Sequence, residues 1–257
     1  MTTIKAQLLI AFSLVTGACA VDADLASTEH HVVGQKILLP DSGTGQNREV
    51  MSTFDPLVVS LYDTYGNPLA NTQITFTAPA SGPSSTFRFG GHAKTDSEGH
   101  AELRPYANQW AGTYTVWASA DGAEPMPFVL TNGAASPAML VPILGTNQLR
   151  TIGQAFELPL TVEVRDNYGN VVEGAPVEFV APASGATTHM MNSAAITDDE
   201  GRASTFAVAG NMPGTYTVLA KVTGAPSIPF VLSNTEMPTG NPRATDLADM
   251  ATHELTP

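Results

Sequence analysis

The sequence predicts an all-β protein made of two tandem β-sandwiches, each with about seven short strands. Three observations support this fold class. The composition is rich in turn-forming residues, with 22 Gly and 19 Pro among 257 residues. A set of five motifs occurs twice in the same order. Between the predicted turns, apolar and polar residues alternate with period two, and no segment shows a convincing helical pattern.

The internal repeat defines the domains. The Asp-x-Tyr-Gly-Asn motif of residues 63–67 recurs at 166–170, and the Gly-Thr-Tyr-Thr-Val motif of residues 112–116 recurs at 214–218. The other three motif pairs keep the same order with nearly constant spacing, which indicates a duplication. The predicted organisation is a signal peptide at 1–18, a linker at 19–30, domain 1 at 31–132, domain 2 at 135–234 and a flexible tail at 235–257.

The alternation also predicts which side chains form each core. Leu57, Val59 and Leu61 share one face of a strand, and a turn follows because Gly and Asn tolerate positive φ while Asp accepts hydrogen bonds from nearby amides. We expect Gly169 to hold such a positive φ. The predicted cores are Leu57, Val59, Leu61, Phe76, Tyr114, Val116 and Phe128 in domain 1, and Leu160, Val162, Val164, Phe179, Tyr216, Val218 and Phe230 in domain 2.

The order of the motifs resembles one known family. Asp-x-Tyr-Gly-Asn, Phe-x-Ala-Pro, Thr-Asp-x-x-Gly, Gly-Thr-Tyr-x-Val-x-Ala and Phe-x-Leu-x-Asn follow one another in both repeats. This series is similar to the group 1 bacterial immunoglobulin-like domains of invasin- and intimin-like adhesins. The resemblance implies two immunoglobulin-like β-sandwiches that space or present binding surfaces outside the cell.

The amino-terminal segment predicts export. An apolar run at 8–15 is too short to span a bilayer as a helix, so a signal peptide is the better interpretation. Residues 15–19 resemble a bacterial lipobox, which implies that Cys19 is acylated; in the alternative, Cys19 is removed with the signal. We therefore expect a lipid-anchored protein at the outer membrane or cell surface, with a periplasmic or secreted protein as the alternative.

Composition and motifs disfavour several function classes. The formal net charge of −13 opposes binding to nucleic acid or to anionic lipid, so membrane contact is expected only through the lipid anchor. With one cysteine at the signal junction, a cysteine nucleophile is excluded, and no metalloprotease, nucleophile-elbow or phosphate-loop motif is present. We predict no catalytic residue and no cofactor.

Two acidic turns are weak candidates for calcium. Closely spaced carboxylates in a turn can hold this ion. The favoured interpretation is structural, because the Asp of Thr-Asp-x-x-Gly can cap backbone amides and the Gly can adopt positive φ. The candidates are Asp96, Glu98, Asp198, Asp199 and Glu200.

Partner contacts are expected where the two copies differ. Domain 1 is richer there in Arg and aromatic residues, the types that dominate interface energies. A surface protein that binds a protein or glycan, or acts as a spacer, is the leading function, with adhesion included. The alternatives are a subunit of an envelope assembly recruited by strand addition and an enzyme with an unrecognised site. The candidate contact residues are Phe87, Arg88, Phe89, Arg104, Tyr106, Trp110 and Trp117.

Overall fold

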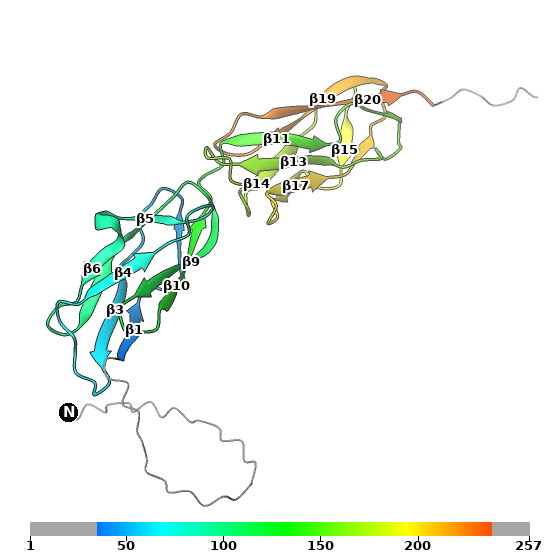
Figure 1. Ribbon diagram of the computed structural model, residues 1–257. Coiled ribbons are helices and arrows are strands. Elements are labelled where there is room, and N and C mark those ends of the chain that lie inside the picture. Colours follow the sequence, from blue (N-terminus) through cyan, green and yellow to red (C-terminus); the bar gives the residue numbers. More distant parts are fainter. Residues whose placement is uncertain (1–34, 238–257) are drawn as a thin grey trace, which may run out of the picture. The chain divides into compact units, whose positions relative to one another are not determined.

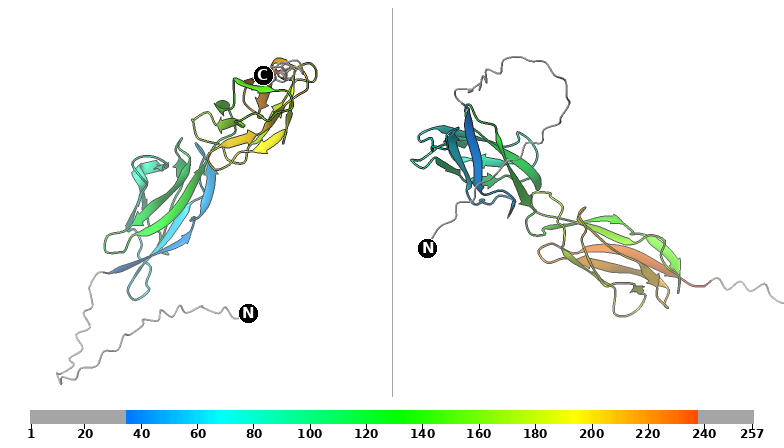
Figure 2. Two further views of the ribbon diagram at one scale, coloured as in Figure 1. Left: turned by 90° about the vertical axis from the view of Figure 1, so that its right-hand side faces the viewer. Right: turned by 90° about the horizontal axis from the view of Figure 1, so that it is seen from below.

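The computed structural model describes residues 35–237. The predicted signal peptide, Cys19, the linker and all but the first residues of the predicted tail lie outside this range. Within it, no helix is long and apolar enough to cross a membrane. The described strands form two β domains, which Figure 1 colours from blue to green and from green to orange, and Figure 2 shows the strands of each from two further sides.

Domain 1 contains ten strands and one short 3₁₀ turn. The strands fall into a three-stranded sheet of order β1-β3-β7, a five-stranded sheet of order β2-β10-β9-β4-β6, and the small pair β5-β8. The elements are β1 (Lys36–Ser42), β2 (Gln46–Glu49), β3 (Leu57–Asp63), β4 (Gln73–Thr77), β5 (Ser85–Phe87), η1 (Arg88–Gly91), β6 (His92–Lys94), β7 (His100–Leu103), β8 (Pro105–Ala107), β9 (Gly112–Ser119) and β10 (Met126–Gly133).

Domain 2 repeats this topology strand for strand. Its sheets have the orders β11-β13-β17, β12-β20-β19-β14-β16 and β15-β18, so each strand takes the place of the one ten labels earlier. The strands are β11 (Met139–Leu144), β12 (Gln148–Thr151), β13 (Leu160–Arg165), β14 (Pro176–Val180), β15 (Thr188–Met190), β16 (Ala194–Ile196), β17 (Arg202–Thr205), β18 (Ala207–Ala209), β19 (Gly214–Lys221) and β20 (Ile228–Thr235).

The predicted fold class is confirmed, with more strands than expected. All-β domains in two sheets match the prediction. The sequence suggested about seven strands per copy, whereas ten are present, because strands of three or four residues such as β2, β5 and β8 are too short to show an alternating pattern. The edges of the five-stranded sheet, β2 and β6, are among these short strands, and short edges offer little template for strand addition.

Each domain has its own hydrophobic core. All fourteen predicted core residues are buried, as the alternation predicted. The centre of each core is a pair of phenylalanines: the ring centroids of Phe76 and Phe128 lie 6.3 Å apart, and those of Phe179 and Phe230 lie 6.5 Å apart. The two clusters of buried residues share no member, so each sandwich packs around its own centre.

A glycine marks the point where the first strand of each domain changes sheets. Gly43 (φ +103°) lies between β1 and β2, and Gly145 (φ +98°) lies between β11 and β12. A Cβ atom would approach the Pro56 carbonyl oxygen to 2.4 Å at the first position and the Pro159 carbonyl oxygen to 2.2 Å at the second. Glycine is required there by both backbone angle and space.

Candidate functional site

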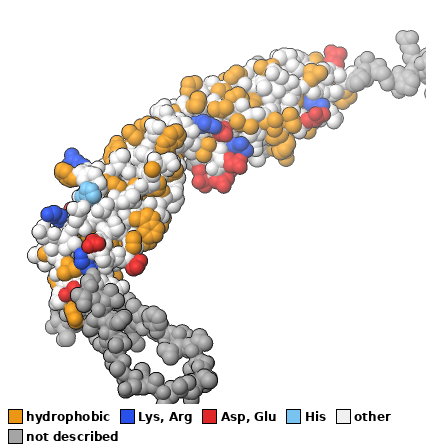
Figure 3. All heavy atoms as spheres, in the orientation of Figure 1, with side chains coloured by type: hydrophobic (Ala, Val, Ile, Leu, Met, Phe, Trp, Pro, Cys, Tyr) orange, Lys and Arg blue, Asp and Glu red, His pale blue; other side chains and the backbone are white. Residues whose placement is uncertain are grey.

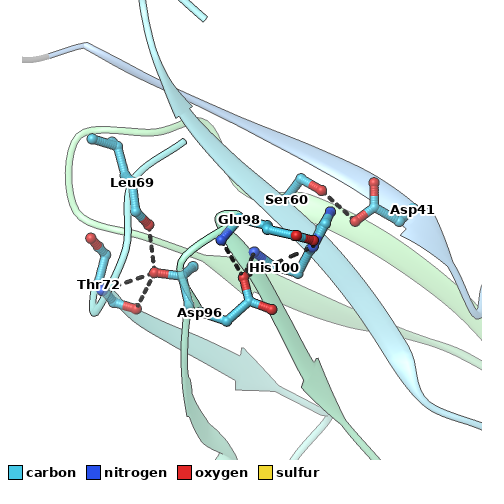
Figure 4. Close-up of polar contacts among 8 residues, drawn as sticks. Asp41, Ser60, Leu69, Thr72, Asp96, Glu98 and His100 are labelled. Atoms are coloured by element: carbon cyan, nitrogen blue, oxygen red, sulfur yellow. Dashed lines mark hydrogen bonds and ion pairs between the residues drawn. The ribbon is translucent and has the colours of Figure 1, made fainter. Parts of the chain in front are cut away.

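The acidic turns between β6 and β7 and between β16 and β17 are capped turns. Asp96 Oδ1 accepts hydrogen bonds from the backbone N–H groups of Glu98 and His100, both at 2.9 Å (Figure 4). The His100 amide is the main cause of the lowered pKa of Asp96. In domain 2, Asp198 Oδ1 accepts from Glu200 at 3.0 Å and from Arg202 at 2.8 Å.

The predicted calcium ligands are not gathered around a common point. The Glu200 carboxylate pairs with the Arg202 guanidinium, and Asp199 is exposed. Between residues 35 and 237, no group of three or more His, Cys, Asp or Glu side chains is arranged to hold a metal ion. Asp96 and Asp198 each cap two backbone amides of their own turn.

In the Asp-x-Tyr-Gly-Asn turns an Asp also caps backbone amides, and here the Asp is more buried. Asp166 is 2% exposed, and its carboxylate accepts hydrogen bonds from the Tyr168 and Asn170 amides, the Asn170 side chain and the Ala135 amide. Burial raises the pKa of Asp166, but these hydrogen bonds outweigh burial and leave the pKa below its ordinary value. Gly169 has φ +87°, as predicted.

A pocket of about 490 Å³ lies on domain 1 where β5 meets β8. This volume falls within the usual range of small-molecule sites. The structure brings four of the seven predicted contact residues together there, Phe87, Arg88, Arg104 and Tyr106, and adds two threonines. The lining residues are Thr53, Thr86, Phe87, Arg88, Arg104 and Tyr106.

Strand register explains why these side chains meet. Tyr106 of β8 lies opposite Thr86 of β5 on one side and forms an isolated bridge with Thr53 on the other. Directly opposed residues on neighbouring strands point to the same face, and all three are exposed. Arg88 and Arg104 adjoin the last pair of this ladder, Phe87 with Pro105, and both line the pocket.

The tyrosine ring of the pocket is held in place by its own hydroxyl. Tyr106 Oη donates a hydrogen bond to the Met51 carbonyl at 2.6 Å. Tyr106 is still 40% exposed, so part of the residue remains accessible at the pocket. Phe87 is half-buried and packs against the core of domain 1, so it connects the pocket to the rigid part of the sandwich.

The other three predicted contact residues do not line this pocket. Phe89 follows Arg88 in η1, is 86% exposed and has φ +55°, an uncommon angle for a bulky residue. Trp110 lies in the loop between β8 and β9, and Trp117 lies on β9; both are about half exposed. Figure 3 shows hydrophobic side chains scattered over the visible face, and such scattered residues are ordinary in soluble proteins, so neither Trp by itself defines a site.

The threonines were missed for a physical reason. Thr53 comes before β3. It pairs with Tyr106 only through an isolated bridge between segments that are far apart in the sequence. The residues around Thr53 contain no pattern that predicts this pairing. Thr86 stands next to a predicted contact residue, but its outward direction depends on the register of β5, a strand of three residues.

The same positions of domain 2 carry different chemistry. The register of β15 with β18 places Met190 and Phe206 at the positions of Phe87 and Arg104. The remaining equivalents are Ala155 for Thr53, His189 for Thr86, Met191 for Arg88 and Val208 for Tyr106. No arginine is present in this set, so the cationic pocket is a feature of one copy.

Comparison with known proteins agrees with the repeat motifs. Residues 156–233 match the model of the bacterial Ig-like domain (group 1). Domain 2 is a group 1 bacterial Ig-like domain. Domain 1 repeats its motifs and its complete strand order, so both sandwiches have the immunoglobulin-like fold that the sequence resemblance implied.

A curated relative of this chain is an adhesin. The inverse autotransporter adhesin YeeJ of Escherichia coli (strain K12) is 32% identical over 169 residues, which cover 65% of this chain and 7% of that protein. The chain thus spans a small part of this relative. An alignment of that length is longer than either domain alone.

Among solved structures, InvD of Yersinia pseudotuberculosis is similar over 80% of this chain and 59% of its own, with a TM-score of 0.53 and 17% identity. FdeC, described as an Escherichia coli adhesin, is matched over 79% of this chain and 64% of its own, with a TM-score of 0.46 and 16% identity. At this level of identity, the InvD likeness supports the fold alone.

Proposed function

We propose that this chain is a non-enzymatic, adhesion-related module displayed outside the cytoplasm, in which domain 1 carries the contact surface and domain 2 serves as scaffold and spacer. The observation that carries this proposal is the similarity of the chain to an adhesin over more than one Ig-like domain. The differences between the two copies support the division of labour, since Arg and aromatic side chains gather on one of them.

The partner is a protein or glycan of another surface. Nucleic acid is disfavoured by the net charge of −13. The non-enzymatic part of the proposal rests on the chemistry of the described residues. The carboxylates with a lowered pKa, Asp63, Asp96 and Asp166, all cap turns. The tyrosines with a raised pKa, Tyr114 and Tyr216, belong to the buried interiors of the two domains.

The experiment for this function is attachment of beads coated with the full chain to cultured host cells and to isolated bacterial envelopes. We expect coated beads to attach to at least one surface more than beads coated with an unrelated acidic protein. Attachment equal to that control on every surface would contradict the adhesion proposal.

We further propose that the chain is held at the membrane by acylation of Cys19. The resemblance of residues 15–19 to a lipobox supports this, and it gives a role to the one cysteine of the sequence. Growth with a fatty-acid analogue should label the wild-type protein and leave Cys19→Ser unlabelled. An unlabelled wild-type protein that starts at Val21 would show that the cysteine is removed with the signal.

A further inference from the structure

We propose that the pocket between β5 and β8 of domain 1 binds an acidic sugar, with Arg88 and Arg104 holding the sugar carboxylate and the Tyr106 ring stacking on the sugar. This inference rests on the proposed function, since it names the ligand class of the contact surface. It goes beyond that function by assigning a separate role to each side chain of the pocket.

The first argument is the pairing of the arginines. Six arginines lie in the described part of the chain. Four of them form ion pairs with carboxylates, namely Arg48, Arg150, Arg165 and Arg202. Within residues 35–237, the two arginines without a carboxylate partner are Arg88 and Arg104, and both line the same pocket.

The second argument is the cost of this arrangement. Arg88 follows Phe87 and Arg104 precedes Pro105 at the last pair of the β5–β8 ladder, so two like charges line one pocket and repel each other. The chain has 24 acidic and 11 basic side chains, yet no Asp or Glu between residues 35 and 237 lines the pocket. A bound anion would neutralise the two guanidinium groups, whose forked donors match a carboxylate geometrically.

The third argument distinguishes a sugar from a simple anion. Tyr106 offers a ring face beside the charges, and its hydroxyl is already used by the Met51 carbonyl, so it acts as a platform and not as a donor to the ligand. The exposed threonines 53 and 86 flank that ring, and neither hydroxyl has a hydrogen-bond partner among the described residues. Hydroxyls beside an aromatic face suit the hydroxyl groups and apolar face of a sugar ring.

Domain 2 provides the design of the variants. Arg88→Met, Arg104→Phe and Tyr106→Val each install the residue that domain 2 carries at the same place in the fold. The domain 2 strands β15 and β18 pair normally with these residues, so the replacements suit the backbone. Arg202→Met removes an equal charge outside the pocket and serves as the matched control, while Tyr106→Phe keeps the ring and removes only the hydroxyl.

The test is saturation-transfer difference NMR on the full chain, titrated with N-acetylneuraminic acid, glucuronic acid, glucose and inorganic phosphate. N-acetylneuraminic acid represents an acidic sugar at the end of a glycan, and glucuronic acid represents one within a polymer. We expect one of the acids to bind with transfer from the Tyr106 ring, and glucose to bind more weakly. Each arginine replacement should weaken acid binding about tenfold, with Arg202→Met unchanged.

Three results would overturn the proposal. One is binding of the acids that survives Arg88→Met/Arg104→Phe. The second is equal binding of glucose and both acids. The third is phosphate as the only probe that binds, which would indicate an anion site without sugar recognition. These readouts use free sugars and purified chain, so they fail or succeed separately from bead attachment, which tests the proposed function.

Discussion

Domain 1 and domain 2 have the same strand order but different polar interiors at the end where β5 meets β8. In domain 2, Tyr216 Oη donates to Asn234 Oδ1 at 2.9 Å, and both residues are buried. The equivalent atoms of domain 1, Tyr114 Oη and Asn132 Oδ1, have no hydrogen-bond partner in the described structure. The same two side chains are therefore joined in one copy and separate in the other.

A second difference lies at Asn108. Its Oδ1 accepts from the Ser84 amide, the Trp110 amide and the Asn132 side chain, and its Nδ2 donates to the Gly82 carbonyl. Domain 2 has Gly210 at this position, where a Cβ would approach the Thr187 carbonyl oxygen to 2.6 Å. Domain 2 thus has no room for a side chain at Gly210, whereas in domain 1 the Asn108 side chain bonds to Ser84, Trp110 and Asn132.

This comparison teaches how a duplicated sandwich can acquire a new surface. The core positions are kept in both copies because they encode the fold. Domain 1 differs from domain 2 in the hydrogen bonds of Asn108 and in the cationic pocket, and both features lie near β5 and β8.

The largest expected effect tests the shared cores. Phe128→Ala and Phe230→Ala each remove a fully buried ring from one of two separate clusters. We expect each to lower the free energy of unfolding of its own domain by about 3–5 kcal/mol. Hydrogen exchange of the full chain, followed by mass spectrometry, measures the two domains separately. Equal loss of protection in both domains from either variant would mean that the cores unfold as one unit.

The next effect tests the shared turns. Gly66 and Gly169 have φ +84° and φ +87°, and a Cβ at either position would meet no atom within 4 Å. Strain in the backbone is therefore the main cost of a side chain there. Gly169→Val should cost about 1–3 kcal/mol in domain 2, and Gly169→Asn clearly less, because Asn tolerates this region. Gly66→Val should likewise destabilise domain 1 more than Gly66→Asn. Equal melting temperatures of the Val and Asn variants would refute the turn assignment.

The third prediction separates the two copies. Tyr216→Phe leaves Asn234 Oδ1 buried without its donor and should destabilise domain 2 by about 1–3 kcal/mol. Tyr114→Phe removes a buried hydroxyl that has no partner in the described structure, so we expect no loss of stability in domain 1. Urea unfolding of both variants measures the difference. If the two losses were equal, the polar interiors of the domains would not differ in the way described.

The smallest effect concerns pH. The pKa of Asp166 lies below its ordinary value of 3.8, so its carboxylate stabilises domain 2 above that value, and this stabilisation is lost as pH falls through the lower pKa of the folded state. Asp166→Asn should remove this part of the acid sensitivity. Asp63 is less buried than Asp166, and its pKa is lowered mainly by the Asn67 side chain, so Asp63→Asn should change acid unfolding less. Melting temperatures between about pH 2 and about pH 6, roughly two units either side of the ordinary value, provide the measurement.

Much of the fold could be predicted from sequence, because motifs and alternation act locally. Leu57 and Phe230 follow from period-two patterns, and Gly169 from its turn motif. The short strands β5 and β8 could not be predicted, since three residues show no period and their pairing depends on distant segments. Composition drew attention to the Arg and aromatic residues of domain 1, four of which line one pocket, but could not show that Thr53 joins them, or that Trp110 and Trp117 lie elsewhere.

The most direct test of the account compares bead attachment by the full chain carrying Arg88→Met/Arg104→Phe with attachment by the same chain carrying Arg202→Met. The account assigns the contact surface to the pocket of domain 1, so the double variant should lose most of its attachment while hydrogen exchange in both domains stays as in the wild type. The control variant should attach as the wild type does. Full attachment by the double variant, or loss of attachment by the control alone, would contradict the assignment of binding to domain 1.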